Sequence, residues 1–152
     1  MTKKLLSIFI FTLLVKCLPV SGQATDMPRM VPVFDITFTS GFSGERVDVY
    51  INNKKIIRDV SLITNEIVAC TTVAVYIFEG DGIFYAQTHI GKRNEKFIKL
   101  PSRDKEVKLR ITYNKMRMEF KLTKDKGRYI LIRKDGKQKL ELDQSNRPPI
   151  FE

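Results

Sequence analysis

Short stretches of alternating apolar and polar residues, separated by turn residues, constrain the fold of this chain most. In the clearest one, residues 47–52, Val47, Val49 and Ile51 alternate with Asp48 and more polar neighbours. Such alternation is typical of a strand with one buried face. No segment combines a 3.6-residue apolar period with capping residues, as a helix would. The sequence therefore predicts an all-β protein.

The best hairpin in the sequence spans residues 106–122. Two alternating segments flank the dipeptide Asn114-Lys115. In an antiparallel pair joined by a two-residue loop, the apolar residues of both segments fall on one face of the ribbon. The charged residues then lie on the opposite, solvent-facing side.

Two further segments give strand predictions. Residues 128–142 contain Asp135-Gly136 at their centre, which predicts a two-residue hairpin turn. Residues 67–78 are apolar on both alternating faces and rich in β-branched side chains. They predict one central strand covered on both sides, with Cys70 buried within it.

The number and spacing of these segments predict the architecture. Nine or ten short strands joined by Gly, Asn and Asp turns indicate an antiparallel β-sandwich, with a β-barrel as the alternative. We expect residues 1–24 to form a signal peptide and residues 25–32 an extended linker. The sandwich domain is expected over residues 33–143, followed by an extended tail over residues 144–152.

The start of the chain has the pattern of a secretory signal peptide. Lys3 and Lys4 precede a mostly apolar stretch, residues 5–15, and small residues follow up to Gly22 and Ala24. The apolar stretch is well short of the roughly 20 residues that span a bilayer. We therefore expect export to the periplasm or the cell exterior, cleavage after Gly22 or Ala24, and no transmembrane segment in the mature chain.

The two cysteines predict neither a lipid anchor nor a disulfide. Cys17 follows Lys16, whereas a lipid-attachment site requires a small neutral residue at that place. Removal of the leader leaves Cys70 as the sole thiol, so no intramolecular disulfide can form. The domain is expected to be held together by its core alone.

No motif in the sequence points to catalysis, a metal or a cofactor. His89 is the only imidazole, and no nucleophile elbow or carboxylate pattern accompanies it. Glu79 and Asp81 lack the further acidic ligands of a calcium loop, so they predict a turn. We expect no enzyme activity, no metal site and no cofactor, and an unrecognised enzyme centred on His89 is the remaining alternative.

The charge balance predicts an acidic partner. The chain has 27 Lys+Arg against 17 Asp+Glu, a formal net charge of +10. On the 106–122 hairpin, Lys108, Arg110, Arg117 and Lys121 share the outward face. Such a face attracts an acidic protein or an anionic polysaccharide, whereas export makes nucleic acid an unexpected partner. The alternative interpretation is a solvated face that discourages edge-to-edge aggregation.

These features predict an exported, non-catalytic binding protein that recognises a protein partner through its basic sheet face, as an inhibitor or an immunity factor does. A carbohydrate-binding or adhesion module is the alternative function. Its candidate ligand-binding residues are the strand tyrosines Tyr50, Tyr76 and Tyr85.

Overall fold

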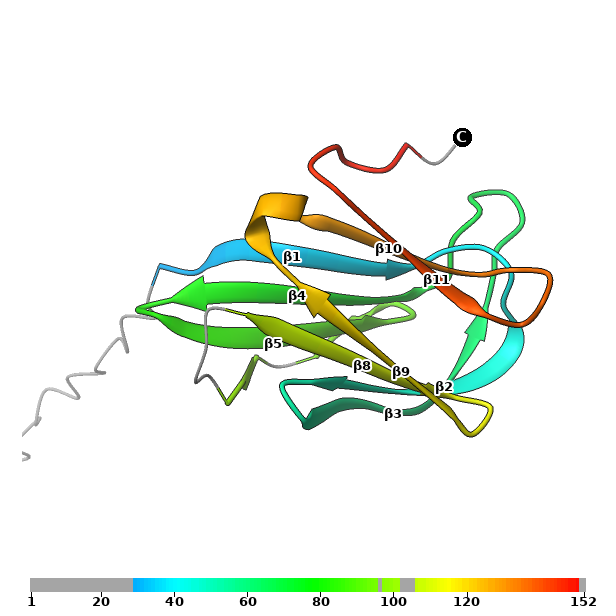
Figure 1. Ribbon diagram of the computed structural model, residues 1–152, viewed down its shortest axis with the longest axis horizontal. Helices are drawn as coiled ribbons and strands as arrows, with labels where there is room; N and C mark the ends of the chain where they lie inside the picture. The colour runs from blue at the N-terminus through cyan, green and yellow to red at the C-terminus, as the bar shows by residue number, and fades with distance from the viewer. Residues whose placement is uncertain (1–28, 96, 102–105, 151–152) are drawn as a thin grey trace, which may run out of the picture.

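The computed structural model describes residues 29–95, 97–101 and 106–150, which form two β-sheets packed face to face (Figure 1). These residues contain no α-helix, and the predicted β-sandwich is confirmed. The predicted signal peptide, residues 1–24, lies outside the described residues. So do the first four residues of the predicted linker, 25–28, and the last two residues of the predicted tail.

One sheet has seven strands and the other has four. The seven-stranded sheet has the order β11–β10–β1–β4–β5–β6, and β7 also pairs with β5. Its strands are β1 (Val31–Phe38), β4 (Val73–Gly80), β5 (Ile83–Ile90), β6 (Arg93–Asn94), β7 (Ile98–Lys99), β10 (Tyr129–Lys134) and β11 (Leu140–Ser145). The four-stranded sheet has the order β3–β2–β8–β9, with β2 (Ser43–Ile51), β3 (Lys54–Ile63), β8 (Val107–Tyr113) and β9 (Met116–Leu122).

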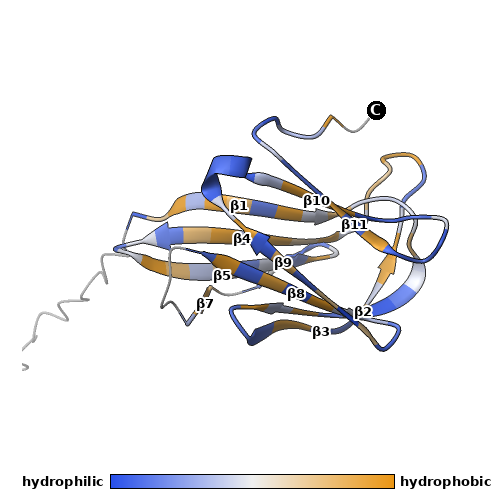
Figure 2. Ribbon diagram, in the orientation of Figure 1, coloured by the Kyte–Doolittle hydropathy of each residue, from blue (hydrophilic) through white to orange (hydrophobic). Residues whose placement is uncertain are grey.

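The core lies between the sheets and consists of the inward residues of both. Ile36 and Ile77 of the larger sheet and Val49 and Ile111 of the smaller one are completely buried. Figure 2 shows the resulting alternation of hydrophobic and hydrophilic residues along the strands. Burying a side chain of this size stabilises the fold by roughly 1.5–3 kcal/mol. Hydrophobic burial therefore holds the sandwich together.

The predicted hairpin of residues 106–122 is present in the expected register. Val107 pairs with Leu122 and Tyr113 with Met116, so only Asn114 and Lys115 form the loop. Both loop residues have a positive φ, 45° and 63°, as the tight turn that suits two twisted strands requires.

The single strand predicted over residues 67–78 is wrong. Strand β4 begins at Val73, and Asn65 N donates to Cys70 O at 2.9 Å to close a loop before it. Ala69 has a φ of 47°, which ends extended backbone even within an apolar stretch. Cys70 is consequently half-buried in this loop and not a core residue.

The two-residue turn predicted at Asp135-Gly136 is also wrong. Residues 135–139 form a longer connection between β10 and β11. The Asp135 carboxylate accepts hydrogen bonds from the backbone N–H groups of Lys137 (2.9 Å) and Lys139 (2.7 Å). The Asp135 side chain thus stabilises a wider turn. An Asp-Gly dipeptide is compatible with both a two-residue turn and this longer connection, so it does not distinguish between them.

Strand β1 lies in the interior of its sheet, where it pairs antiparallel with β4 and parallel with β10. It starts at Val31 and includes Pro32, and the register with β4 shifts directly after Pro32. Proline has no backbone N–H to donate, so it is tolerated at this irregularity of the ladder. The chain reaches β10 through a short 3₁₀ turn, η1 (Lys124–Lys126), and Gly127. A Cβ on Gly127 would lie 2.1 Å from the Ser145 carbonyl carbon, so this close approach requires glycine.

Candidate functional site

The four basic residues predicted on the 106–122 hairpin do share the outward face of β8 and β9, and we call them the basic hairpin face. Lys108 and Lys121 are directly paired across the two strands. Arg110 is opposite Glu119, and Arg117 is two pairs further along, opposite Thr112. The alternation of the hairpin therefore brings all four side chains to one surface, as the sequence predicts.

Two of these four residues are paired with carboxylates of the same hairpin. Arg117 forms an ion pair and a hydrogen bond with Glu119, and this hydrogen bond lowers the pKa of the Glu119 carboxyl. Lys121 Nζ lies 2.5 Å from Glu106 Oε1. Such exposed pairs add little stability, but each one neutralises a charge that a partner would otherwise meet.

Arg110 and Lys108 differ from the other two. The Arg110 guanidinium carbon lies 4.0 Å from the centre of the Tyr50 ring, and Nη1 donates to Asn53 Oδ1 at 3.3 Å. Neither residue forms an ion pair with a described carboxylate. Their charges are therefore available to a ligand, and they lie toward the β2–β3 turn.

Lys108 also lines a groove of about 870 Å³ at that end of the sandwich. We call this the cationic groove. Its lining residues come from the β2–β3 turn, from β7 and the residues after it, and from the start of β8. They are Asn52, Asn53, Lys54, Lys99, Leu100, Pro101, Glu106 and Lys108.

Positive charge dominates the cationic groove. Lys54, Lys99 and Lys108 contribute three ammonium groups, and none of them pairs with a carboxylate in the part of the chain that the structure describes. Glu106 is the acidic residue among the lining residues, and its carboxylate is paired with Lys121 on the outer face. The groove is therefore arranged to attract an anion.

Hydrogen bonds from the Asn52 side chain hold the walls of the groove in place. Its Oδ1 accepts from the Lys108 backbone N–H at 2.9 Å, and its Nδ2 donates to the Pro101 carbonyl at 3.1 Å. Lys54 Nζ donates to the Lys99 carbonyl at 2.8 Å, which joins the two sheets at this end. Asn52 has a φ of 47°, a conformation that asparagine adopts more readily than most residues. The groove is thus formed before any ligand arrives.

Tyr50 adjoins this site through Arg110. Tyr85 is paired across the strands with the groove residue Lys99, whereas Tyr76 is paired with Gln87. Besides Arg110, Lys55 lies over the Tyr50 ring, with Nζ 5.1 Å from its centre. Lys55 also donates to Asp48, and this hydrogen bond lowers the pKa of the Asp48 carboxyl. Tyr50 is therefore part of a half-buried cluster of charged side chains on the smaller sheet.

Tyr76 and Tyr85 lie on the outward face of the larger sheet. Tyr76 is paired with Gln87, and Tyr85 with Phe78, so the two tyrosines are diagonal neighbours on adjacent strands. The structure thus brings two of the three candidate residues together and separates them from Tyr50.

The residues considered for catalysis and metal binding are scattered over the fold. His89 is half-buried on β5, and Cys70 is half-buried in the loop before β4. Glu79 forms an ion pair with Lys124, and Asp81 is exposed in the β4–β5 turn. Among the residues that the structure describes, no three His, Cys, Asp or Glu side chains are grouped so as to hold a metal ion.

Sequence reasoning missed the part of the site contributed by Lys54, Lys99 and Asn52. The sequence Asn52-Asn53-Lys54 is typical of a turn, but alternation does not identify which strands lie beside a turn. Lys99 comes from the two-residue strand β7, which pairs with Tyr85 and Ala86 rather than with a neighbour in sequence. No local pattern marks these residues as one groove.

No protein-family model, curated protein or solved structure matches this chain. In the described ranges, none of the secondary-structure elements is a helix with the length and hydropathy needed to cross a membrane. The geometry of the cationic groove and of the basic hairpin face is therefore the basis for a functional proposal.

Proposed function

We propose that this chain is an exported, non-catalytic binding protein that recognises an acidic segment of a partner protein, as an inhibitor or an immunity factor does. The site is the cationic groove together with Lys108 and Arg110 of the adjoining strand. The observation that carries the proposal is the set of three ammonium groups around a preformed groove, none of which forms an ion pair with a described carboxylate.

The distribution of charge favours a short acidic peptide segment over an anionic polysaccharide. Because Arg117 and Lys121 are paired with carboxylates, the unneutralised cations are gathered at one end of the hairpin. A linear polyanion is held best by an extended row of cations, which this face lacks. The groove also presents Asn52 and Asn53, whose amide groups suit a peptide backbone.

The proposal is tested with a fluorescently labelled oligoglutamate peptide, whose binding to the full-length chain is followed by anisotropy. The double charge reversals Lys108→Glu/Arg110→Glu and Lys54→Glu/Lys99→Glu should each weaken binding by about tenfold or more, since each removes about 1.4 kcal/mol or more of attraction. The reversal Arg117→Glu/Lys121→Glu is the matched control. It changes the net charge by the same amount but alters residues that are already paired, so we expect a much smaller loss.

Three outcomes would contradict the proposal. Equal losses in all three double variants would show that net charge alone attracts the peptide. Unchanged affinity in all three, with circular dichroism confirming folded protein, would reduce the surface to a solvated face. Tighter binding of heparin than of oligoglutamate, lost in the same variants, would assign the groove to an anionic polysaccharide. In the proposed case, binding weakens as salt rises, because ions screen exposed charges.

The second candidate function is a carbohydrate-binding or adhesion module on the larger sheet. The observation that favours it is the diagonal pair Tyr76 and Tyr85, with Phe78 beside them on the same outward face. Adjacent aromatic rings offer a platform on which sugar rings stack. The variant Tyr76→Ala/Tyr85→Ala should then lose retention on insoluble neutral polysaccharides. Tyr50→Ala, on the other sheet, is the control and should keep it.

A further inference from the structure

The loop between β3 and β4, residues 64–72, carries exposed aliphatic side chains at its tip, and we call it the apolar loop. Ile67 is 83% exposed and Val68 is 40% exposed, and Ile63, directly before the loop, is 65% exposed. Figure 2 shows this loop as a hydrophobic protrusion at one end of the sandwich. Three exposed large aliphatic residues within positions 63–68 indicate a contact surface.

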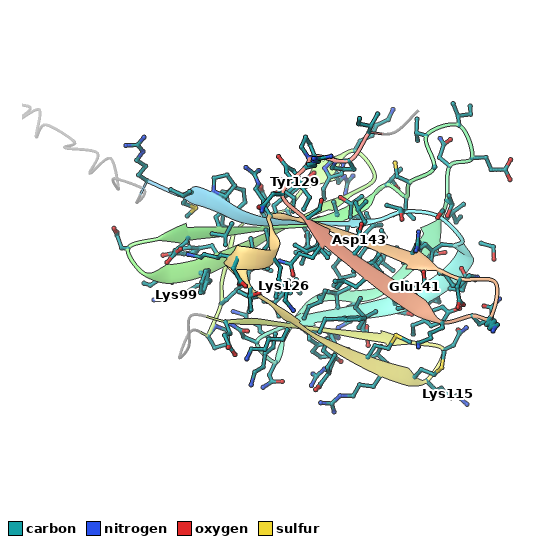
Figure 3. All side chains as sticks on the ribbon, turned by 45° about the horizontal axis from the view of Figure 1, so that its top comes forward. Lys99, Lys115, Lys126, Tyr129, Glu141 and Asp143 are labelled. Carbon is teal, nitrogen blue, oxygen red and sulfur yellow. The ribbon has the colours of Figure 1, made fainter. Side chains whose placement is uncertain are left out.

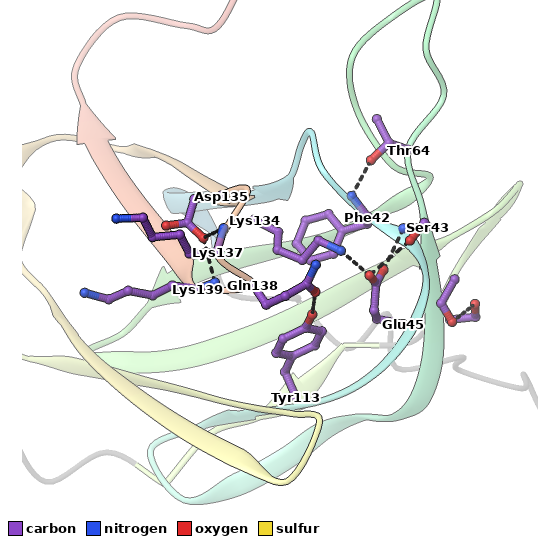
Figure 4. A network of polar contacts seen from close by, with 12 residues as sticks. Phe42, Ser43, Glu45, Thr64, Tyr113, Lys134, Asp135, Lys137, Gln138 and Lys139 are labelled. Atoms are coloured by element: carbon purple, nitrogen blue, oxygen red, sulfur yellow. Dashed lines mark hydrogen bonds and ion pairs between the residues drawn. The ribbon is translucent and has the colours of Figure 1, made fainter.

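Hydrogen bonds give the apolar loop a defined shape. Thr64 Oγ1 accepts from the Phe42 backbone N–H at 2.9 Å (Figure 4). It also donates to the Thr39 carbonyl at 3.1 Å, and the two hydrogen bonds fix the base of the loop. The Asn65 carboxamide oxygen accepts from the Ile67 N–H at 2.9 Å. The aliphatic tip is therefore presented outward by the fold.

Two other turns place cations beside the apolar loop. Gly91 N donates to the Thr72 carbonyl at 2.9 Å, so the β5–β6 turn with Lys92 lies next to it. Lys134 N donates to the Ser40 carbonyl, which brings the β10–β11 connection, with Lys137 and Lys139, to the same end.

The β8–β9 turn, with exposed Lys115, also faces this end. The Tyr113 hydroxyl, just before that turn, is hydrogen-bonded to Gln138 Oε1 at 2.9 Å. None of the exposed cations of these turns forms an ion pair with a described residue. They are Lys92, Arg93, Lys115, Lys137 and Lys139.

We propose that this end of the molecule binds the surface of an anionic phospholipid bilayer, with Ile67 and Val68 inserted among the headgroups. An aliphatic protrusion with cations on several sides matches a laterally uniform, negatively charged surface. A protein interface would instead be centred on aromatic or arginine side chains in a packed pocket, and the loop tip has neither. Charge complementarity therefore selects the lipid surface as the partner.

Glu66 sets the depth of this contact. Its exposed carboxylate lies beside Ile67 and is repelled by anionic headgroups. Insertion is consequently shallow, and the cations of the neighbouring turns supply much of the attraction. Removal of this single negative charge should strengthen binding.

The proposed lipid site is far from the cationic groove. Lys54 of the groove and Ile63 before the apolar loop are at opposite ends of the ten-residue strand β3. Figure 3 likewise shows Lys99 of the groove and Lys115 at opposite ends of the molecule. The protein would thus sit on a membrane with the groove directed away from it.

The test uses a reporter on the loop itself, because a leader that is still attached to the chain would bind vesicles in every variant. In the full-length chain with Cys17→Ser and Cys70→Ser, an environment-sensitive fluorophore is attached to Val68→Cys. Its emission should shift to the blue with vesicles that contain phosphatidylglycerol, and not with pure phosphatidylcholine. The same fluorophore on Lys99→Cys is the control and should not respond.

Three further variants, made in the labelled background, define the interaction. Ile67→Ser should reduce the vesicle affinity reported by the fluorophore, and Lys137→Glu/Lys139→Glu should reduce it by about fivefold or more for each charge. Glu66→Gln should increase it. Because these residues are exposed, all three variants should keep the fold. The Ile67→Ser variant should also bind oligoglutamate as tightly as the wild type. Failure of lipid binding and failure of oligoglutamate binding are therefore distinguishable by experiment.

Two results would overturn the proposal. One is the absence of a blue shift with anionic vesicles, or an equal shift with phosphatidylcholine alone. The other is a blue shift that appears without vesicles as the protein concentration rises, because it would assign the apolar loop to contact with a second copy of the chain.

Discussion

The Lys134 ammonium on β10 forms a hydrogen-bonded ion pair with the Glu45 carboxylate on β2, and so joins the two sheets (Figure 4). Both side chains are nearly buried, with 7% and 13% of their surfaces exposed. Glu45 also accepts a hydrogen bond from the Ser43 backbone N–H at 2.6 Å. A charge pair in such surroundings is costly to break, because the group left behind would be buried without a partner.

The pH dependence of stability should show the effect of Glu45. Burial by itself raises the pKa of its carboxyl, but the hydrogen bonds from Lys134 and Ser43 outweigh burial and lower the pKa from 4.5 to about 2. The resulting stabilisation is fully present above pH 4.5 and is lost as the pH falls toward 2. It is on the order of 3 kcal/mol. Urea denaturation should show a steeper loss in this range for the wild type than for Glu45→Gln, and parallel curves would contradict the assignment.

Substitution of one partner of this pair should cost more than substitution of both. Lys134→Met leaves the Glu45 carboxylate buried without its partner, and we expect a loss of about 3 kcal/mol in the free energy of unfolding. The double variant Lys134→Met/Glu45→Leu replaces the pair by apolar side chains and should lose less. Chemical denaturation at neutral pH measures both. A double variant less stable than Lys134→Met would contradict the prediction, because it would show that the unpaired Glu45 carboxylate is not the source of the loss.

The loop of the β8–β9 hairpin offers a stabilising substitution. Lys115 has a φ of 63°, a left-handed conformation that is strained for a lysine. Lys115→Gly relieves this strain and should raise the free energy of unfolding by about 0.5 kcal/mol, after the entropy of glycine in the unfolded chain is subtracted. Asn114→Gly is the matched comparison and should gain less, since asparagine tolerates this conformation. A lower melting temperature for Lys115→Gly would contradict the prediction.

The predicted export is tested on protein recovered from outside the cytoplasm. Cleavage after Gly22 or Ala24 gives a chain that begins at Gln23 or Thr25. Amino-terminal sequencing and intact mass distinguish the two sites. Retention of Met1 would contradict cleavage, and a lipid-sized mass increase on a chain that begins at Cys17 would show an anchored protein.

Local pattern was sufficient to predict the β8–β9 hairpin. The alternation from Val107 to Leu122 predicted its strands, its loop and its outward basic residues, because each of these depends only on neighbours in sequence. The same reasoning failed from Ile67 to Thr72, because β4 begins only at Val73. Apolar residues there are compatible with an exposed loop as well as with a strand, and hydrogen bonds made by Thr64 decide between them.

The candidate site could be predicted only in part for a similar reason. Lys108 and Arg110 follow from strand alternation, but the neutralisation of Lys121 depends on Glu106, whose role is visible only in three dimensions. The groove requires β7 of one sheet to approach the β2–β3 turn of the other. Such an approach is set by the packing of the sheets and leaves no periodic signal in the sequence.

The parallel pairing of β1 with β10 has a consequence for how the chain folds. Asp35 and Arg128, which form an ion pair where these strands meet, are 93 positions apart in the sequence. Strand β1 therefore keeps one edge unpaired until the chain has been synthesised through β10, and closure of so large a loop slows folding. During that interval β1 exposes a hydrogen-bonding edge to any other extended chain. A chaperone that shields this edge would favour the native sandwich. A truncation that removes β10 would leave the edge unpaired and favour aggregation.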